Sequence, residues 1–179
     1  MEELRIASLR ALAEMGGSVL EVEGKAVVRQ PGGFSEFANQ PGSMLEVEEA
    51  RVRVHGHRGA GVWETVEGVS LNCDRVVLLV PLDGADPGLE PDLAGEHQMV
   101  RAKLFMVGIE VTGFVATAVQ DTVANLLEES RARFVRVAEA RLFSGPDRHW
   151  LDDRPDGVRF CLVNRRLVTA CIETRPGAD

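Results

Sequence analysis

Two stretches of the sequence decide the fold prediction: Met44-Leu-Glu-Val-Glu-Glu-Ala-Arg-Val52 and, at an offset of 90 residues, Phe134-Val-Arg-Val-Ala-Glu-Ala-Arg-Leu142. They share Val, Glu, Ala and Arg at matching positions, and the triplet Glu-Ala-Arg is the strongest anchor. Apolar and polar residues alternate in both, which predicts half-buried β-strands. The alternation changes phase at Glu48-Glu49 and again at Ala138-Glu139, which predicts a β-bulge at the same place in each strand.

The similarity extends to both sides of these strands. Leu20-Glu-Val-Glu-Gly24 aligns with Ile109-Glu-Val-Thr-Gly113 at an offset of 89, and Asn72-Cys-Asp-Arg-Val-Val77 aligns with Val163-Asn-Arg-Arg-Leu-Val168 at an offset of 91. A repeat of this length indicates one structural unit present twice. We therefore predict two tandem copies of one module, at 18–83 and 100–174. The alternative is chance similarity between short amphipathic stretches.

The remaining residues form three segments outside these copies. Residues 1–17 carry Leu4, Leu9, Leu12 and Met15 at mixed helical spacing before Gly16-Gly17, and predict an N-terminal amphipathic helix. This helix is expected to pack on the first module or, alternatively, to bind a partner. Residues 84–99 are rich in proline, glycine and acids and predict a linker, and 175–179 form a tail.

Each module contains the same order of predicted elements. The β-branched stretches at 19–29 and 102–117 predict a bent strand or a tight pair, followed by a short helix capped by Ser35 in one copy and by Asp121 or Thr122 in the other. The anchor strand comes next, and an apolar last strand follows at 69–81 and 160–173. The predicted fold class is mainly β with short helices, built by tandem duplication of a small curled sheet or half-barrel.

Composition excludes several classes of protein. The chain has 179 residues, 45% of them hydrophobic, and its apolar runs are shorter than the roughly 20 residues of a membrane-spanning helix. Acids near the N-terminus, in place of a positively charged leader, favour a cytoplasmic location. The net charge of -8 argues against binding to nucleic acid or to a membrane. The three cysteines, Cys73, Cys161 and Cys171, match no zinc or redox spacing, so we expect buried free thiols.

One part of the first copy resembles a known family. Phe34-Ser-Glu-Phe-Ala-Asn39, the anchor strand that begins at Met44, and Leu71-Asn-Cys-Asp-Arg-Val-Val77 resemble a bacterial family of short β-rich domains of unknown function. This chain has Ala38 where the family pattern prefers leucine, and the second copy keeps only the hydrophobic skeleton. The resemblance implies a fold and no catalytic residue.

Candidate chemical motifs are weak. His55-Gly-His57, with Cys73 or His97, would be an incomplete metal-ligand set, and a polar hairpin tip is the simpler interpretation. The sequence holds no Gly-x-Ser-x-Gly elbow and no phosphate loop, and Asp152-Asp153 lies among turn residues. We expect neither an enzyme nor a cofactor or metal site.

Charged residues of opposite sign mark the two copies and supply the candidate binding residues. The contrast sets Arg131, Arg133, Arg136, Arg165 and Arg166 in the second copy against Glu46 and Glu48 in the first. Arg51 and Arg53 are further candidates, expected with these two acids near the boundary between subunits. The favoured hypothesis is a non-enzymatic protein-interaction or assembly module, with another protein or a second copy of this chain as partner. The alternative is a small ligand-sensing or RNA-binding barrel that uses the second-copy arginines with Trp150 and Phe160 as stacking surface. A third interpretation is two simple solvated faces.

The sequence also favours a homodimer. The strand 45–54 alternates charged and apolar residues and is expected at an exposed sheet edge, where it could pair across a twofold axis. The last strand, 160–173, is too apolar to be expected at an edge.

Overall fold

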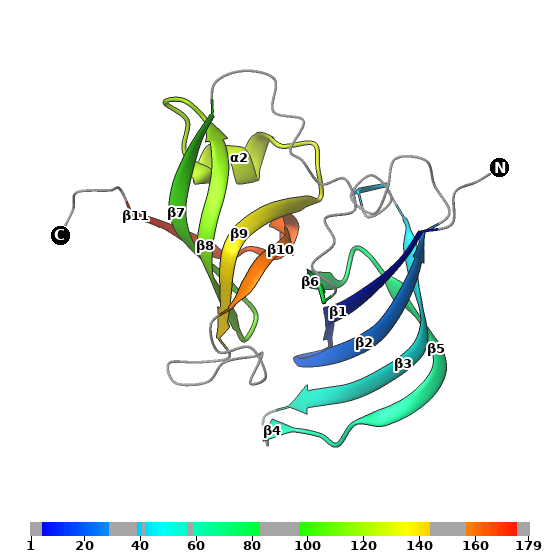
Figure 1. The fold of residues 1–179 in the computed structure, drawn as a ribbon. Coiled ribbons are helices and arrows are strands. Elements are labelled where there is room, and N and C mark those ends of the chain that lie inside the picture. Colours follow the sequence, from blue (N-terminus) through cyan, green and yellow to red (C-terminus); the bar gives the residue numbers. More distant parts are fainter. Residues whose placement is uncertain are drawn as a thin grey trace. The chain divides into compact units, whose positions relative to one another are not determined.

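The computed structural model of the protein describes residues 5–28, 39–40, 42–56, 59–82, 97–143 and 157–174. The chain divides into two compact units, Met1–Glu90 and Pro91–Asp179. Both are built mainly of antiparallel strands (Figure 1), so the predicted mainly β fold is confirmed. The predicted linker at 84–99 overlaps the unit boundary, but its last residues belong to a strand that begins at His97, and 84–96 lie outside the described residues, as does the tail.

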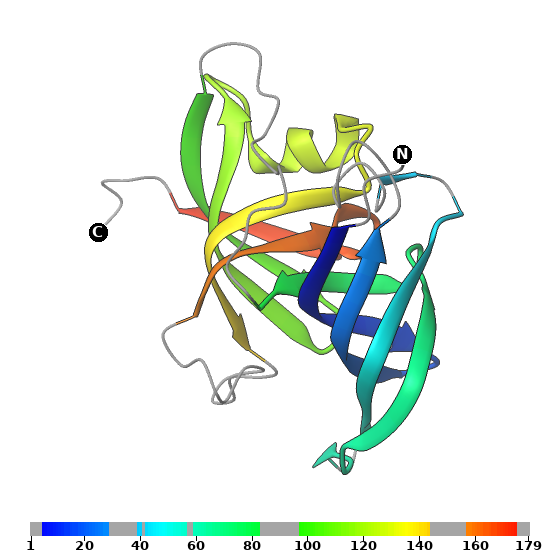
Figure 2. The ribbon, with the colours of Figure 1, turned by 45° about the vertical axis from the view of Figure 1, so that its right-hand side comes forward.

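The first unit is a curled antiparallel sheet. Its strands are β1 (Arg5–Met15), β2 (Ser18–Val28), β3 (Met44–Gly56), β4 (Gly59–Ala60), β5 (Glu64–Asn72) and β6 (Val76–Pro81). Within the unit they follow the order β6-β1-β2-β3-β5, and β4 pairs with the end of β3. Figure 2 shows how β1, β2 and β3 bend along their length. No ladder joins β5 to β6 in the described part of the chain, so the curled sheet is not closed.

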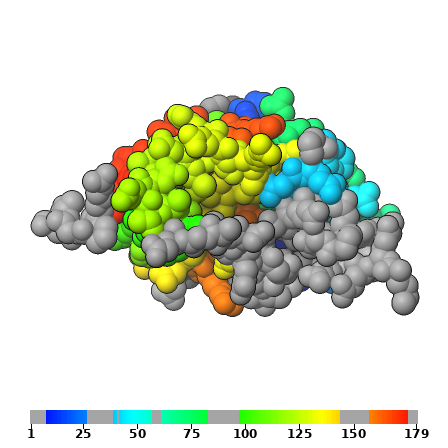
Figure 3. All heavy atoms as spheres, turned by 90° about the horizontal axis from the view of Figure 1, so that it is seen from above, coloured from blue at the N-terminus to red at the C-terminus, as the bar shows by residue number. Residues whose placement is uncertain are grey.

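The second unit has the same strand order. Its elements are β7 (His97–Met106), β8 (Ile109–Ala118), α2 (Val123–Glu129), β9 (Phe134–Phe143), β10 (Val158–Asn164), a 3₁₀ turn (Arg165–Leu167) and β11 (Ala170–Thr174). The order within the unit is β11-β7-β8-β9-β10, so the last strand again pairs with the first. The predicted cap of α2 is confirmed, because the Thr122 side chain accepts a hydrogen bond from the Asn125 N–H. The outer face of this helix lies at the surface in Figure 3.

The predicted bulges are confirmed in both units. Glu49 and Glu139 each adopt a φ of 49°, and the register shifts at the glycine on the neighbouring strand, Gly24 or Gly113. A Cβ at Gly24 would lie 2.7 Å from the backbone oxygen of Glu48, and one at Gly113 would lie 2.5 Å from the backbone oxygen of Ala138. Glycine is therefore required because the bulged strand approaches the backbone too closely for a side chain.

A second local feature recurs at the ends of β5 and β10, the last strands of the two orders. The side chains of Asn72 and Asn164 accept a hydrogen bond from the backbone N–H two residues later. Asn72 pairs with Met44, and Asn164 pairs with Phe134. The two asparagines are thus equivalent at an offset of 92, one residue away from the sequence alignment of Asn72 with Val163. Duplication as the origin of these likenesses remains a prediction.

The predicted N-terminal helix is wrong. Arg5–Met15 is strand β1, and it pairs with β2 on one side and with β6 on the other. Every residue from Leu9 to Ala13 is buried, so both faces are covered and no polar alternation reveals a strand. Gly16 and Gly17, with φ of 56° and 88°, form a hairpin turn and not a helix stop. The first module therefore begins at β1 and not at residue 18.

The predicted last strands are also wrong, because each is two strands. Turns at 73–75 and at the 3₁₀ segment divide the stretches into β5 with β6 and β10 with β11. In the 102–117 stretch the tight pair is correct: β7 and β8 form a hairpin around Gly108, whose φ is 69°. Ser35 and residues 36–38 of the other predicted helix lie outside the described residues.

The core of each unit consists of aliphatic side chains from the strands. In the first unit it includes Leu45, Val47, Val76, Leu78 and Leu79, and in the second Leu104, Val111, Val137, Leu162 and Val163. Cys161 is fully buried among them, and this burial raises the pKa of its thiol to about 12. Cys73, Cys161 and Cys171 are free thiols; Cys73 and Cys161 are buried, but Cys171 is only partly buried, so the expected burial is wrong for that residue.

Candidate functional site

The strand predicted to lie at an edge is central. β3 pairs with β2 on one side and with β5 on the other, so Glu46, Glu48, Arg51 and Arg53 do not border a free strand. The prediction that 45–54 is an edge is wrong. Alternation of polar and apolar residues reports one solvated face of a strand, and a central strand of a curled sheet has such a face too.

Within the described residues, the strand order of the first unit ends at β5 and β6, and that of the second unit ends at β11 and β10; of these ends, we consider β5 and β11. This also corrects the expectation that the last strand avoids an edge. β5 and the neighbouring part of β3 carry five described acids, all exposed: Glu46, Glu48, Glu49, Glu64 and Glu67. On β11, Ile172 is 54% exposed, and it faces Lys103 of β7, while Thr174 faces Arg101. The β5 edge is therefore acidic on balance, although Arg51 faces Thr65 there. The β11 edge is basic on balance, although it carries Glu173, which accepts hydrogen bonds from the first N–H groups of α2.

The second-copy arginines do not form one binding surface. The Arg165 guanidinium donates to the backbone oxygens of Leu127 (2.6 Å) and Ala132 (2.8 Å), where it holds the end of α2. Arg133 is buried, Arg131 and Arg166 are exposed, and Arg136 lies over the Phe160 ring at 4.6 Å. Phe160 itself is only 2% exposed, so it cannot serve as a stacking surface for a base. Trp150 lies outside the described residues.

A cluster of charged side chains runs across β1, β2 and β3 in the first unit. Its members are Arg10, Glu21, Glu23, Arg51, Arg53 and His55, and we call it the β1–β3 charge cluster. The ladder places Arg10 opposite Glu23, Glu23 opposite Arg51, and Glu21 opposite Arg53. Oppositely charged residues at directly facing positions are within reach of one another across a sheet.

Glu21 forms the floor of this cluster. Its side chain has no exposed surface, and its Oε2 lies 2.5 Å from both Arg53 Nε and His55 Nε2. Its Oε1 has no hydrogen-bond partner in the described structure and lies 3.5 Å from Arg10 Nε. A buried carboxylate persists only with such cationic partners, because burial of an isolated charge is very costly.

Glu23 links the buried part of the cluster to its exposed rim. It accepts hydrogen bonds from Arg10 Nη2 and from Arg51 Nη2, both at 2.7 Å. Partial burial alone would raise the pKa of this carboxyl group, but the hydrogen bonds from Arg10 and Arg51 outweigh it, and the pKa is lowered. Glu23 is therefore ionised wherever the protein is folded at neutral pH.

Trp63 supports the two outer arginines. The guanidinium carbons of Arg51 and Arg53 lie 5.1 Å and 4.5 Å from the centroid of its ring. A guanidinium over an indole face at this distance is a stabilising cation–π contact. Trp63 and the carboxylates together restrict how both arginines can point.

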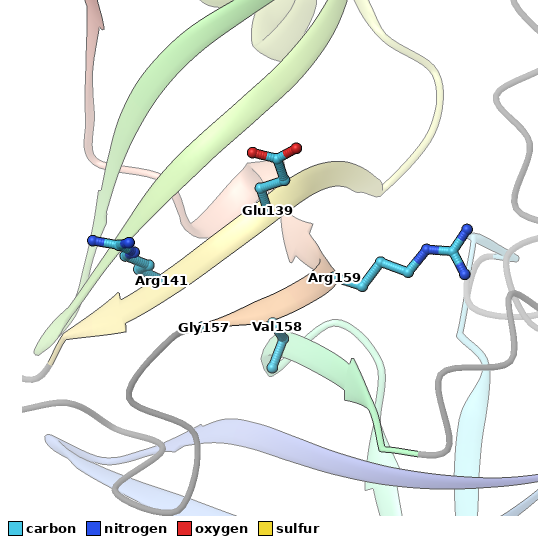
Figure 4. A pocket seen from close by; sticks show the side chains of 5 residues that line it. All are labelled: Glu139, Arg141, Gly157, Val158 and Arg159. Atoms are coloured by element: carbon cyan, nitrogen blue, oxygen red, sulfur yellow. The ribbon is translucent and has the colours of Figure 1, made fainter.

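A shallow hollow of about 330 Å³ lies on the second unit. It is lined by Glu139, Arg141, Gly157, Val158 and Arg159 (Figure 4). The side chains of Arg141 and Arg159 point in opposite directions from the two strands. They do not converge on one point, so this hollow is a weaker candidate than the β1–β3 charge cluster.

The histidines considered as metal ligands do not form a ligand set in the described part of the chain. His55 is committed to Glu21, and His57 lies outside the described residues. Among the residues searched, no group of three or more His, Cys, Asp or Glu side chains could hold a metal ion. Likewise, none of the described helices is long and apolar enough to cross a membrane.

Comparison with known proteins returned no match to a family model, to a curated protein or to a solved structure. The resemblance to a bacterial family of β-rich domains is thus a proposal that rests on its quoted residues.

Sequence reasoning named only two members of the cluster as binding residues, Arg51 and Arg53. It missed Arg10, Glu21, Glu23 and Trp63, and it considered His55 only as part of a polar hairpin tip or, less simply, as a metal ligand. The signal was present: acids at alternate positions, Glu21 and Glu23, precede basic residues at alternate positions of the next strand. Once the two strands are paired, this pattern predicts facing ion pairs.

Proposed function

We propose that this protein is a non-enzymatic assembly module whose copies join through their free sheet edges, β5 of one copy pairing with β11 of another. The observation that carries the proposal is the opposite charge of these two edges. Acids flank β5, and Arg101 and Lys103 stand beside β11. Charges of opposite sign favour encounter and suppress pairing of like edges.

Backbone hydrogen bonds between the two edge strands would hold the copies together, and the charged side chains would guide the two edges toward each other. A free edge strand presents unpaired N–H and C=O groups, which a further strand can satisfy. β5 has nine residues and β11 has five, so up to five residues of each could pair. Ile172, which is more than half exposed on β11, would gain cover in such a contact.

The geometry distinguishes two forms of assembly. Pairing of β5 with β11 joins different surfaces, so it produces a chain or ring unless two copies exchange both contacts across a twofold axis. The second form is the homodimer expected from the sequence. A cytoplasmic location, also expected from the sequence, remains a prediction.

Light scattering over a tenfold range of protein concentration tests the proposal. We expect the wild-type mass to rise with concentration, and Ile172→Lys to remain monomeric because it adds a charge to a β11 edge that is already basic. Val119→Lys is the matched control: Val119 is also an exposed valine-sized apolar residue of the second unit, 47% exposed, but lies outside both edges. A wild-type mass that stays monomeric at every concentration, or equal masses for the two variants, would reject assembly through β11.

A further inference from the structure

The β1–β3 charge cluster contains one more cation than anion. Arg10, Arg51 and Arg53 supply three positive charges, and Glu21 and Glu23 supply two negative ones, before any charge on His55 is counted. The excess is not spread evenly. Arg10 and Glu21 are buried, whereas half of the Arg51 side chain and a fifth of the Arg53 side chain are exposed.

The exposed ends of the two arginines have donors to spare. Arg53 uses Nε for Glu21, and Arg51 uses one Nη for Glu23. In the described residues, the two Nη groups of Arg53 and the other Nη of Arg51 donate no hydrogen bond to protein. A guanidinium has five N–H donors in a fixed plane, so each arginine keeps a donating side after its carboxylate is satisfied.

The two guanidinium groups are also held near one another. Arg51 and Arg53 lie two residues apart on one face of β3, about 6.6 Å along the strand. Both stack on the same Trp63 ring and are tied to carboxylates on the next strand. Their order is thus established before any ligand binds, which lowers the entropic cost of binding.

We infer that Arg51 and Arg53, supported by Trp63, bind a phosphate group. A phosphate group has two negative charges near neutral pH and several acceptor oxygens, which matches two guanidinium groups with free donors. One of its two negative charges would balance the single excess cation of the cluster. This site lies on the face of the sheet and not on its β5 edge, so it does not depend on the proposed assembly.

The fluorescence of Trp63 gives a direct readout. The chain has two tryptophans, and Trp150→Phe leaves Trp63 as the sole indole reporter. In this background we titrate inorganic phosphate at constant ionic strength, with chloride as the balancing anion. We expect a saturable change in Trp63 emission with phosphate and none with chloride.

Two variants test the assigned residues. Arg51→Gln is expected to weaken phosphate binding at least tenfold, because it removes one charge-assisted contact. Arg75→Gln is the matched control: it removes an exposed arginine of the same unit, outside the cluster, and should change binding less than twofold. Light scattering on the same samples separates a failure of this site from a failure of assembly.

Arg51→Lys is a more conservative variant that keeps the test possible if Arg51→Gln does not fold. It keeps the charge but loses the planar fork, and we expect binding between those of wild type and Arg51→Gln. Thermal melting establishes which variants are folded. The inference is overturned if phosphate and chloride act alike, or if the folded Arg51 variants bind as well as Arg75→Gln does.

Discussion

The two units share a backbone plan and differ in the chemistry of one sheet face. Both have the same strand order, a bulge at an equivalent glutamate, a glycine opposite it and an asparagine turn. The faces diverge at the charge cluster. The positions of Arg10, Glu21, Glu23 and Arg53 in the first unit correspond, through the ladders, to Lys103, Glu110, Thr112 and Phe143 in the second.

This difference separates what the fold needs from what a site needs. Positions 24 and 113 are both glycine because the backbone of the facing strand leaves no room for a Cβ atom. The face carries no such constraint, and among the described residues a buried ion network is found there in the first unit alone. In the second unit the remaining pair, Lys103 and Glu110, lies 3.4 Å apart with both side chains partly exposed. The same strand order is therefore found in one unit with this network and in the other without it.

The largest expected effect comes from breaking the buried network. Glu21→Gln should lower the free energy of unfolding by about 3–5 kcal/mol, because it leaves the cations around it without their buried anion. Glu110→Gln, at the equivalent position, should cost less than about 1 kcal/mol, since its pair is partly exposed. Urea unfolding of both variants measures the contrast. If both variants lost the same free energy of unfolding, the ion pairs on the two sheet faces would contribute equally to stability and the contrast would be wrong.

The bulge glycines test the shared part of the plan. Gly24→Ala and Gly113→Ala should each cost about 1–3 kcal/mol, because the new Cβ would overlap the backbone of the facing strand. Gly68→Ala is the control, since its Cβ would meet only an ordinary contact at 3.4 Å. The variants are compared by their urea midpoints at a constant slope. If either bulge glycine tolerated alanine as Gly68 does, the equivalence of the two bulges would be lost.

The acid dependence of stability should differ between the faces as well. The folded pKa of Glu23 is lowered, so the unfolded state binds protons more readily than the folded one. The stabilisation is present above the ordinary carboxyl pKa, near 4.5, and is lost as the pH falls through the lower folded value. Glu23→Gln should therefore flatten the stability curve in this acidic range. Melting of Glu23→Gln and of the wild-type protein at stepped pH measures this change.

The sequence predicted those features of the fold that leave a periodic or local mark. The phase change at Glu48-Glu49 and Ala138-Glu139 identified both bulges, and Thr122 identified the start of α2. β1 could not be recognised, because Leu9 to Ala13 are covered on both faces and alternation disappears. The edge strands were predicted wrongly for a related reason. Whether a strand lies at an edge depends on which strands pair with it, and the sequence of a single strand does not reveal its partners.

The candidate site depended on pairing even more strongly. Arg51 and Arg53 were named from their charge, but their role needs Glu21 and Glu23 on the facing strand and Trp63 from beyond the hairpin. The predicted second-copy arginines scatter, because charge alone does not tell a solvated arginine from one such as Arg165, which binds backbone oxygens.

The smallest expected effect concerns the bulge glutamates themselves. A non-glycine residue with φ near 50° is strained, and glycine relieves that strain at the cost of extra freedom in the unfolded chain. The two terms oppose each other, so Glu49→Gly and Glu139→Gly should each stabilise the protein by only about 0.5 kcal/mol. Glu49 also loses an exposed ion pair with Lys25, which is a minor contribution. Glu46→Gly, in the regular part of the same strand, should instead destabilise by about 0.5–1 kcal/mol. Because the same φ occurs at both bulges, the two gains should agree within the error of a melting curve. A gain at one bulge and a loss at the other would mean that the likeness of the two units ends at their strand order.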